Sequence, residues 1–124
     1  MNIKVIDPVV HNIIDYFSIL LLWLSPSIFG LSGVVTIVLY ILGFIHLFIT
    51  VCTISPLGLF KVIPFKIHGW IELSAGIILM ALPWILQYSD NILGTVISLI
   101  YSFSLIILWF LSNYNFMAKK RKIT

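Results

Sequence analysis

The fold class is decided by one uncharged stretch, residues 31–54, which reads LSGVVTIVLYILGFIHLFITVCTI. A transmembrane helix needs about 20 consecutive apolar residues, so this stretch alone is long enough to cross a bilayer. The whole chain has the same character, because 61% of its 124 residues are hydrophobic, 9% are charged and the mean hydropathy is +1.18. A soluble domain is about 25% charged. These numbers exclude an ordinary soluble domain, a disordered tail and a nucleic-acid-binding protein.

Three further apolar runs accompany this stretch, at residues 9–25, 67–86 and 92–113. The connections between the first and second runs and between the third and fourth runs are short and contain Ser, Pro, Gly and Asn. Short connections of that composition join antiparallel neighbours, so the four runs predict two helical hairpins. We therefore expect an all-α, polytopic membrane protein in which four transmembrane helices form a single domain.

The basic residues indicate how the chain sits in the membrane. None lies inside an apolar run, and they occupy the N-terminal segment, the middle loop and the C-terminal segment: Lys4, Lys61, Lys66, Lys119, Lys120, Arg121 and Lys122. Cytoplasmic loops carry an excess of Lys and Arg, so all three segments are predicted on the cytoplasmic side, with both termini inside. The C-terminal cations also predict contact with anionic membrane lipids.

The chain resembles itself when it is shifted by 57 residues. His11 then falls on His68, Asp15 falls on Glu72 and Pro26 falls on Pro83. Because this offset contains two spans, both halves keep the same direction in the membrane, which is the arrangement of parallel repeats. We expect a first repeat over about residues 9–56, a second over about 66–114, and an approximate twofold axis between them.

The two prolines of this offset carry a short motif at the predicted end of a helix. The first half has Ser25 and Pro26, and the second half has Pro83 and Trp84. Each half thereby resembles the SPW-repeat family of small prokaryotic membrane proteins, although neither copy of the Ser-Pro-Trp motif is complete. The resemblance implies a bacterial or archaeal cell membrane and no established reaction. Proline ends a helix and tryptophan anchors at the membrane interface, so we interpret these four residues as a structural helix end.

Five ionisable residues lie inside the apolar runs. His11 and Asp15 are four residues apart, and so are His68 and Glu72, so each pair shares one helical face. His46 lies within the second run at a depth that could bring it near both acids. Ionisable groups inside a membrane cost about 2.5–3.5 kcal/mol each on insertion scales, which makes these five residues the candidate polar site.

The chemistry of this site is left open by the sequence. Imidazole and carboxylate together suit Zn, Mn or Fe, but the spacing matches neither the Glu-x-x-His motif of di-iron bundles nor H-E-x-x-H. Structural pairing, a proton or ion path and a metal site therefore remain, and no cofactor is predicted. A separate stripe of small residues, Gly94, Ser98 and Ser102, predicts close packing of the fourth helix.

Three functions follow from these residues. The first is a non-enzymatic scaffold, accessory or self-assembling membrane subunit, because the short loops leave no room for a soluble catalytic surface. The second is a permease-like protein that moves protons or a cation through the His/acid pairs. The third is a metal-binding membrane enzyme. The predicted partners are membrane lipids and either a second copy of the chain or another membrane protein, with no nucleic acid.

Overall fold

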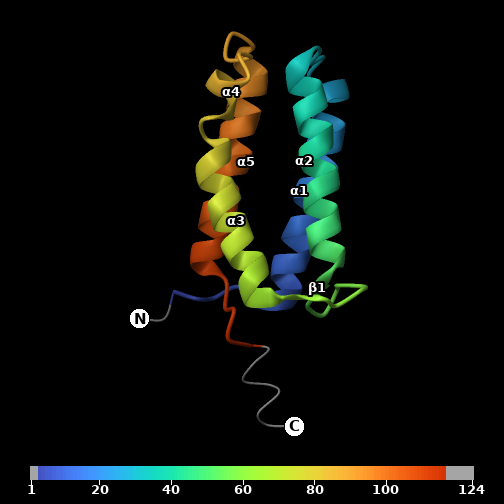
Figure 1. Ribbon diagram of the computed structural model, residues 1–124, viewed down its shortest axis with the longest axis vertical. Coiled ribbons are helices and arrows are strands. Elements are labelled where there is room, and N and C mark those ends of the chain that lie inside the picture. The colour runs from blue at the N-terminus through green and yellow to red at the C-terminus, as the bar shows by residue number, and fades with distance from the viewer. Residues whose placement is uncertain (1–2, 117–124) are drawn as a thin grey trace.

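The computed structural model describes residues 3–116 and is mostly helical (Figure 1). Three of its helices are long and apolar enough to cross a membrane: α1 (Pro8–Ile28), α2 (Val34–Val51) and α5 (Ile92–Leu111). A shorter helix, α3 (Phe65–Leu79), and a single turn, α4 (Leu82–Ile85), lie between α2 and α5. The predicted all-α membrane class is therefore supported by three spans rather than by four.

The helices form two antiparallel hairpins that stand side by side (Figure 1). Helix α1 packs mainly against α2, and α3 packs mainly against α5, whereas the backbones of the two hairpins approach each other at few points. Side chains still join the hairpins, because Leu22 and Leu39 share one buried apolar cluster with Leu105.

Side chains begin two of these helices. Asp7 accepts a hydrogen bond from the backbone of Val10, and Asn91 accepts one from Gly94, as N-cap residues do.

The third predicted span is interrupted. We expected one helix over residues 67–86, but α3 ends at Leu79 and α4 begins at Leu82. The cause is Pro83, which has no N–H to donate to the carbonyl of Leu79 and whose ring clashes with that turn. The residues between α3 and α4 are as apolar as those on either side, so the hydropathy of the sequence does not reveal the break.

The proline of the first half behaves differently. Helix α1 runs through Pro26 and ends at Ile28, so the prediction that it stops at this proline is wrong by about one turn. Helix α2 also differs from its predicted range, because it begins after Gly33 and ends at Val51. Gly33 has a φ of 72°, a left-handed conformation that glycine adopts readily, and it marks the tight turn between α1 and α2.

The loop after α2 contains two short strands that the sequence does not predict. Strand β1 (Thr53–Ile54) pairs in parallel with β2 (Ile63–Pro64). Helix α1 fixes the turn between these strands, because the Tyr16 hydroxyl donates to the carbonyl of Leu57 at 2.9 Å and the Asn12 side chain accepts from its N–H at 3.2 Å. The loop is thus tied to the first turns of α1.

The two ends of the described chain meet at the same end of the molecule (Figure 1). Ile6 donates its N–H to the carbonyl of Leu111 at 3.0 Å and accepts from Asn113 at 2.9 Å. The middle loop lies at this end as well. The common end holds the segments of Lys4, Lys61 and Lys66, whereas the four C-terminal cations at residues 119–122 lie outside the described residues. That all three basic segments share one side of the membrane stays a prediction.

The surface is apolar, and the interior between the hairpins combines an apolar core with many buried polar side chains. Large hydrophobic side chains such as Phe17, Phe44 and Ile100 are more than half exposed along the outer faces of the long helices. An apolar surface of this extent suits lipid and not water. The buried set, by contrast, includes histidines, acids, serines and threonines.

The small residues of α5, Gly94, Ser98 and Ser102, lie on its buried face. A Cβ added to Gly94 would lie 2.6 Å from Cγ2 of Val35, so the backbone of α5 approaches α2 closely there. Ser98 and Ser102 are buried, and each hydroxyl donates to the carbonyl four residues earlier. Ser25, Pro26 and Pro83 are buried at the end opposite to the termini, whereas Trp84 is exposed.

Candidate metal centre

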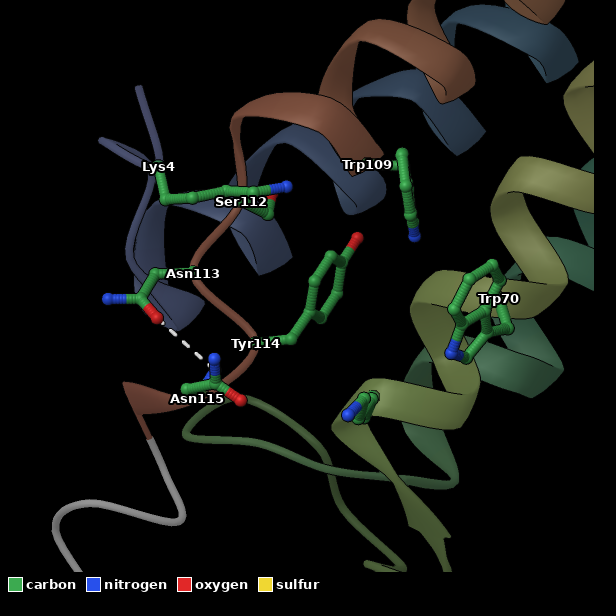
Figure 2. Close-up of a pocket in the computed structure, with 8 residues that line it drawn as sticks. Lys4, Trp70, Trp109, Ser112, Asn113, Tyr114 and Asn115 are labelled. Carbon is green, nitrogen blue, oxygen red and sulfur yellow. Dashed lines mark hydrogen bonds between the residues drawn. The ribbon is translucent and has the colours of Figure 1, made fainter. Parts of the chain in front are cut away.

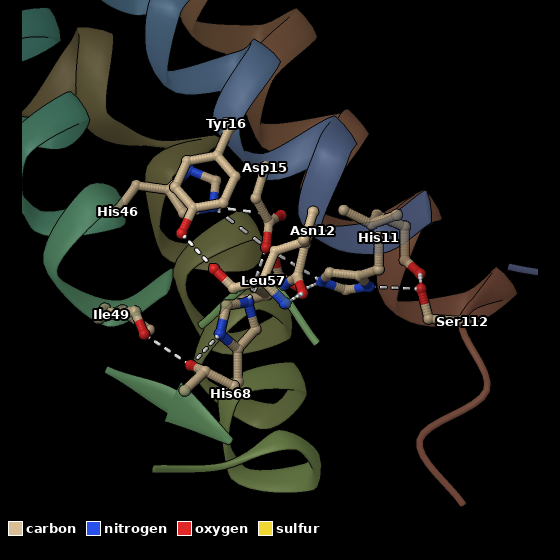
Figure 3. A network of polar contacts seen from close by, with 12 residues as sticks. His11, Asn12, Asp15, Tyr16, His46, Ile49, Leu57, His68 and Ser112 are labelled. Atoms are coloured by element: carbon tan, nitrogen blue, oxygen red, sulfur yellow. Dashed lines mark hydrogen bonds and ion pairs between the residues drawn. The ribbon is translucent and has the colours of Figure 1, made fainter. Parts of the chain in front are cut away.

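The five ionisable residues that the sequence selects meet in one buried cluster (Figure 3). Helix α1 supplies His11 and Asp15, α2 supplies His46, and α3 supplies His68 and Glu72. Their side chains are between 0% and 6% exposed. The cluster therefore lies buried between the two hairpins, and His46 and Glu72 also line a shallow apolar surface pocket.

The histidines and acids pair crosswise between the hairpins. His11 Nε2 lies 3.1 Å from Glu72 Oε2 and 3.4 Å from Asp15 Oδ2, four residues along its own helix. His68 Nε2 lies 3.2 Å from Asp15 Oδ2 and 3.3 Å from Glu72 Oε1. Each histidine is thus closer to the acid of the other hairpin than to its own. The two matched pairs of the 57-residue offset form a single site.

These contacts have the spacing of ligands around an ion. Metal–ligand bonds of about 2.0–2.2 Å place neighbouring ligands of a tetrahedral ion about 3.3–3.6 Å apart. One ligand atom from each of His11, Asp15, His68 and Glu72 lies within 4.8 Å of the other three, so the His–acid contacts are close to tetrahedral spacing whereas the group as a whole is wider. Among the residues that the structure describes, the Nε2 atoms of all three histidines are buried without a hydrogen bond of good geometry. The side chains therefore surround a common centre.

A hydroxyl group fixes the orientation of two of these imidazoles. His11 Nδ1 lies 2.7 Å from Ser112 Oγ, and His68 Nδ1 lies 2.7 Å from Thr53 Oγ1 (Figure 3). Both hydroxyl protons are already used, because Ser112 donates to the carbonyl of Leu108 and Thr53 donates to that of Ile49, each at 2.6 Å. Each hydroxyl oxygen must then accept from Nδ1–H. A ring that is neutral then presents an Nε2 lone pair to the centre, as a metal-binding histidine does, whereas a protonated ring would present Nε2–H to the carboxylates.

The third imidazole lies at the edge of the cluster. His46 Nε2 is 3.4 Å from Asp15 Oδ1 and 3.7 Å from Glu72 Oε1. Its Nδ1 is 2.9 Å from the Tyr101 hydroxyl of α5. His46 is therefore positioned as an outer, fifth nitrogen beside the four closer ligands.

The charges of the site match one divalent cation. Asp15 and Glu72 supply two negative charges, and the three imidazoles are neutral when their Nε2 lone pairs face an ion. Burying unpaired carboxylates costs several kcal/mol each, so the site needs either a dication or protonated histidines. The donor set of nitrogen and carboxylate oxygen suits zinc, iron or manganese.

One tyrosine connects the cluster to the outside. The Tyr114 hydroxyl donates to Glu72 Oε2 at 3.4 Å. Burial raises the pKa of the Tyr114 phenol, and the negative charge of Glu72 raises it further, so the phenol stays protonated and donates. Tyr114 also lines a surface pocket at the end of the molecule where the termini meet.

Sequence reasoning found the five central residues but missed the groups that orient them. Thr53 is one of the threonines of the second run, and nothing in the sequence pairs it with His68. Ser112 lies 57 residues after Ser55, which is the offset that matches His11 with His68. This match is the one sequence feature that could have singled out Ser112. The helix-end residues and the α5 stripe contribute no central ligand to the cluster.

Comparisons of the chain with protein-family models, with curated proteins and with solved structures found no match. The resemblance to the SPW-repeat family therefore rests on the Ser25, Pro26, Pro83 and Trp84 motif and stays a prediction.

Proposed function

We propose that this chain is an integral membrane protein that binds one divalent transition-metal ion between its two helical hairpins. The observation that carries this proposal is the convergence of three Nε2 atoms on two buried carboxylates, with two of the rings oriented by hydroxyl groups on Nδ1. An ion at that centre would satisfy atoms that otherwise have no partner and would neutralise both acids.

The ion would act chiefly as a structural link. Its four close ligands come from α1 and α3, which belong to different hairpins and whose backbones approach each other at few points. Sites in which the protein supplies four ligands are typical of structural metals, whereas catalytic sites keep one position open. This role agrees with a non-enzymatic scaffold or accessory subunit that works with membrane lipids and with a second copy or another membrane protein.

Metal analysis of the purified protein tests the proposal. We expect one zinc, iron or manganese ion per chain in the wild type and almost none in Glu72→Gln, because the glutamine removes one of the two balancing charges. Asp90→Asn is the matched control, since Asp90 lies in the loop before α5 and far from the cluster in sequence. A wild-type protein that holds no stoichiometric metal under any loading condition would disprove the proposal.

Proton exchange is the second candidate, and the Tyr114 contact favours it. The hydroxyl of Tyr114 joins the carboxylate of Glu72 to a pocket on the surface, which gives protons a hydrogen-bonded entry to the cluster. Proteoliposomes that carry a pH-sensitive dye would report proton flux. We expect Tyr114→Phe and the double variant Asp15→Asn/Glu72→Gln to abolish such flux, and unchanged flux in the double variant rules this function out.

For the membrane arrangement, we propose that α3 and α4 together complete a fourth span and that both termini lie in the cytoplasm of a prokaryotic cell. Support comes from Lys4, Lys61 and Lys66, whose segments lie at one end of the described structure. The four further cations at residues 119–122 add support from the sequence alone. Single cysteines at positions 4 and 115, in a Cys52→Ser background, test this arrangement. Labelling of either cysteine by a membrane-impermeant reagent in intact cells would contradict it.

A further inference from the structure

A pocket of mixed polar and apolar lining lies beside the metal centre, at the end of the molecule where the described termini meet (Figure 2). Its volume is about 170 Å³. The N-terminal segment contributes Lys4, α3 contributes Lys66 and Trp70, and α5 contributes Trp109. The segment after α5 completes the wall with Ser112, Asn113, Tyr114 and Asn115. Three parts of the chain that are distant in sequence therefore build this pocket.

The pocket is basic. Two of its lining residues are lysines and none is acidic. The Lys4 ammonium lies 4.9 Å from the centroid of the Trp109 ring and 5.4 Å from that of Phe110, so aromatic faces hold it at the wall. Lys66 is exposed beside Trp70. The charge of the wall is complementary to an anion.

The position of the pocket along the membrane-spanning helices indicates which anion it can bind. Trp70 and Trp109 lie near the ends of their helices and contact each other, with ring centroids 5.5 Å apart. Tryptophan and lysine at the ends of membrane helices lie at the level of the lipid headgroups. The side-chain amides of Asn113 and Asn115 add hydrogen-bond donors to the same wall (Figure 2). A phospholipid can therefore reach the pocket laterally, with its phosphate at the lysines and its acyl chains along the apolar helices.

We propose that this pocket binds the phosphate-containing headgroup of an anionic phospholipid. The headgroup would lie next to the metal centre, because Ser112 and Tyr114 line the pocket and also contact His11 and Glu72. The pocket itself uses no metal ligand, so lipid binding does not depend on the proposed metal function.

Native mass spectrometry of the full chain in detergent tests the proposal. The probes are phosphatidylglycerol and phosphatidylcholine with identical acyl chains. A lysine at an anionic membrane surface contributes about fivefold to binding. We expect phosphatidylglycerol to bind more tightly, with a loss of about fivefold in Lys66→Gln and no remaining preference in Lys4→Gln/Lys66→Gln. Lys61→Gln is the matched control, since Lys61 is an exposed lysine of the middle loop outside the pocket.

Three results would overturn the proposal. Equal binding of both lipids would show that the pocket does not select an anion. An equal loss in Lys61→Gln would show that general surface charge, and not the pocket, attracts the lipid. Displacement of the lipid by inorganic phosphate would assign the pocket to a soluble phosphate compound. Glu72→Gln separates this proposal from the metal function, because the variant should lose its ion and keep its preference for phosphatidylglycerol.

Discussion

Thr53→Val is the sharpest test of how the metal centre is built. Valine has nearly the shape of threonine and removes only the hydroxyl that accepts from His68 Nδ1. In the metal-free variant the His68 proton can move to Nε2, which faces two carboxylates at 3.2 and 3.3 Å. In the metal-bound variant the Nε2 lone pair is occupied, so Nδ1–H stays buried without an acceptor. The penalty therefore falls on the bound state alone.

The size of this penalty follows from the burial of His68, which is 0% exposed. An unsatisfied buried donor costs about 1–3 kcal/mol, which corresponds to a loss of metal affinity of about 5- to 150-fold. Removal of groups that orient metal-binding histidines costs about 10- to 100-fold in other metal sites, in the same range.

A competition titration with a chromophoric chelator measures this affinity for Zn²⁺, and the absorption spectrum of bound Co²⁺ reports the coordination. Thr50→Val is the matched control, because Thr50 is also fully buried near the end of α2 and its hydroxyl has no hydrogen-bond partner in the structure. Equal affinities in Thr53→Val, Thr50→Val and the wild type would refute the role of the hydroxyl. An equal loss in both variants would assign the effect to packing.

Three further predictions concern metal removal and helix packing. Removal of the metal by a chelator should lower the free energy of unfolding by about 2.7 kcal/mol relative to protein with free metal at 100 times Kd. The loss is measured as a fall in Tm, which readdition of Zn²⁺ should reverse, and a Tm that the chelator leaves unchanged would contradict a structural ion. Gly58→Ala should weaken metal binding, because the new Cβ would collide with the backbone carbonyl oxygen of Thr53 and shift the Thr53 hydroxyl away from His68. An unchanged absorption spectrum of bound Co²⁺ would argue against this coupling. Gly76→Ala should destabilise the second hairpin by about 1–3 kcal/mol in denaturant titrations, since its Cβ would lie 2.7 Å from Ile106 Cγ1 and 3.0 Å from the carbonyl oxygen of Ser102, and a neutral effect would mean that α3 and α5 can separate without cost.

The sequence predicted the central residues because two rules act on them directly. A spacing of four residues places His11 beside Asp15 and His68 beside Glu72 on any helix, whatever the tertiary fold. The cost of burying such groups in lipid makes them candidates for one site, whereas the sequence leaves open whether the three histidines converge. His46 has no acid at this spacing, so only its depth in the second run linked it to the cluster.

Other parts of the structure depend on contacts that a sequence pattern does not carry. The strands β1 and β2 have two residues each, too few to show an alternating pattern. The break between α3 and α4 lies in a continuous apolar run, where Pro83 was read as a helix end and not as an interruption. The hydroxyl contacts to the histidines arise only when α5 and the middle loop dock against α1 and α3.

The crosswise pairing of His11 with Glu72 and of His68 with Asp15 has a consequence for how such a site can be assembled. Either hairpin alone holds one histidine and one acid, half of a coordination shell. Two identical hairpins related by a twofold axis would bring the same four groups together on that axis, so a homodimer half this size could bind the ion. In the single chain the two halves are free to differ. His46 shows such a difference, because the residue 57 positions later is Phe103 and not a second histidine. A symmetric dimer would present this ligand candidate twice, whereas the single chain presents it once.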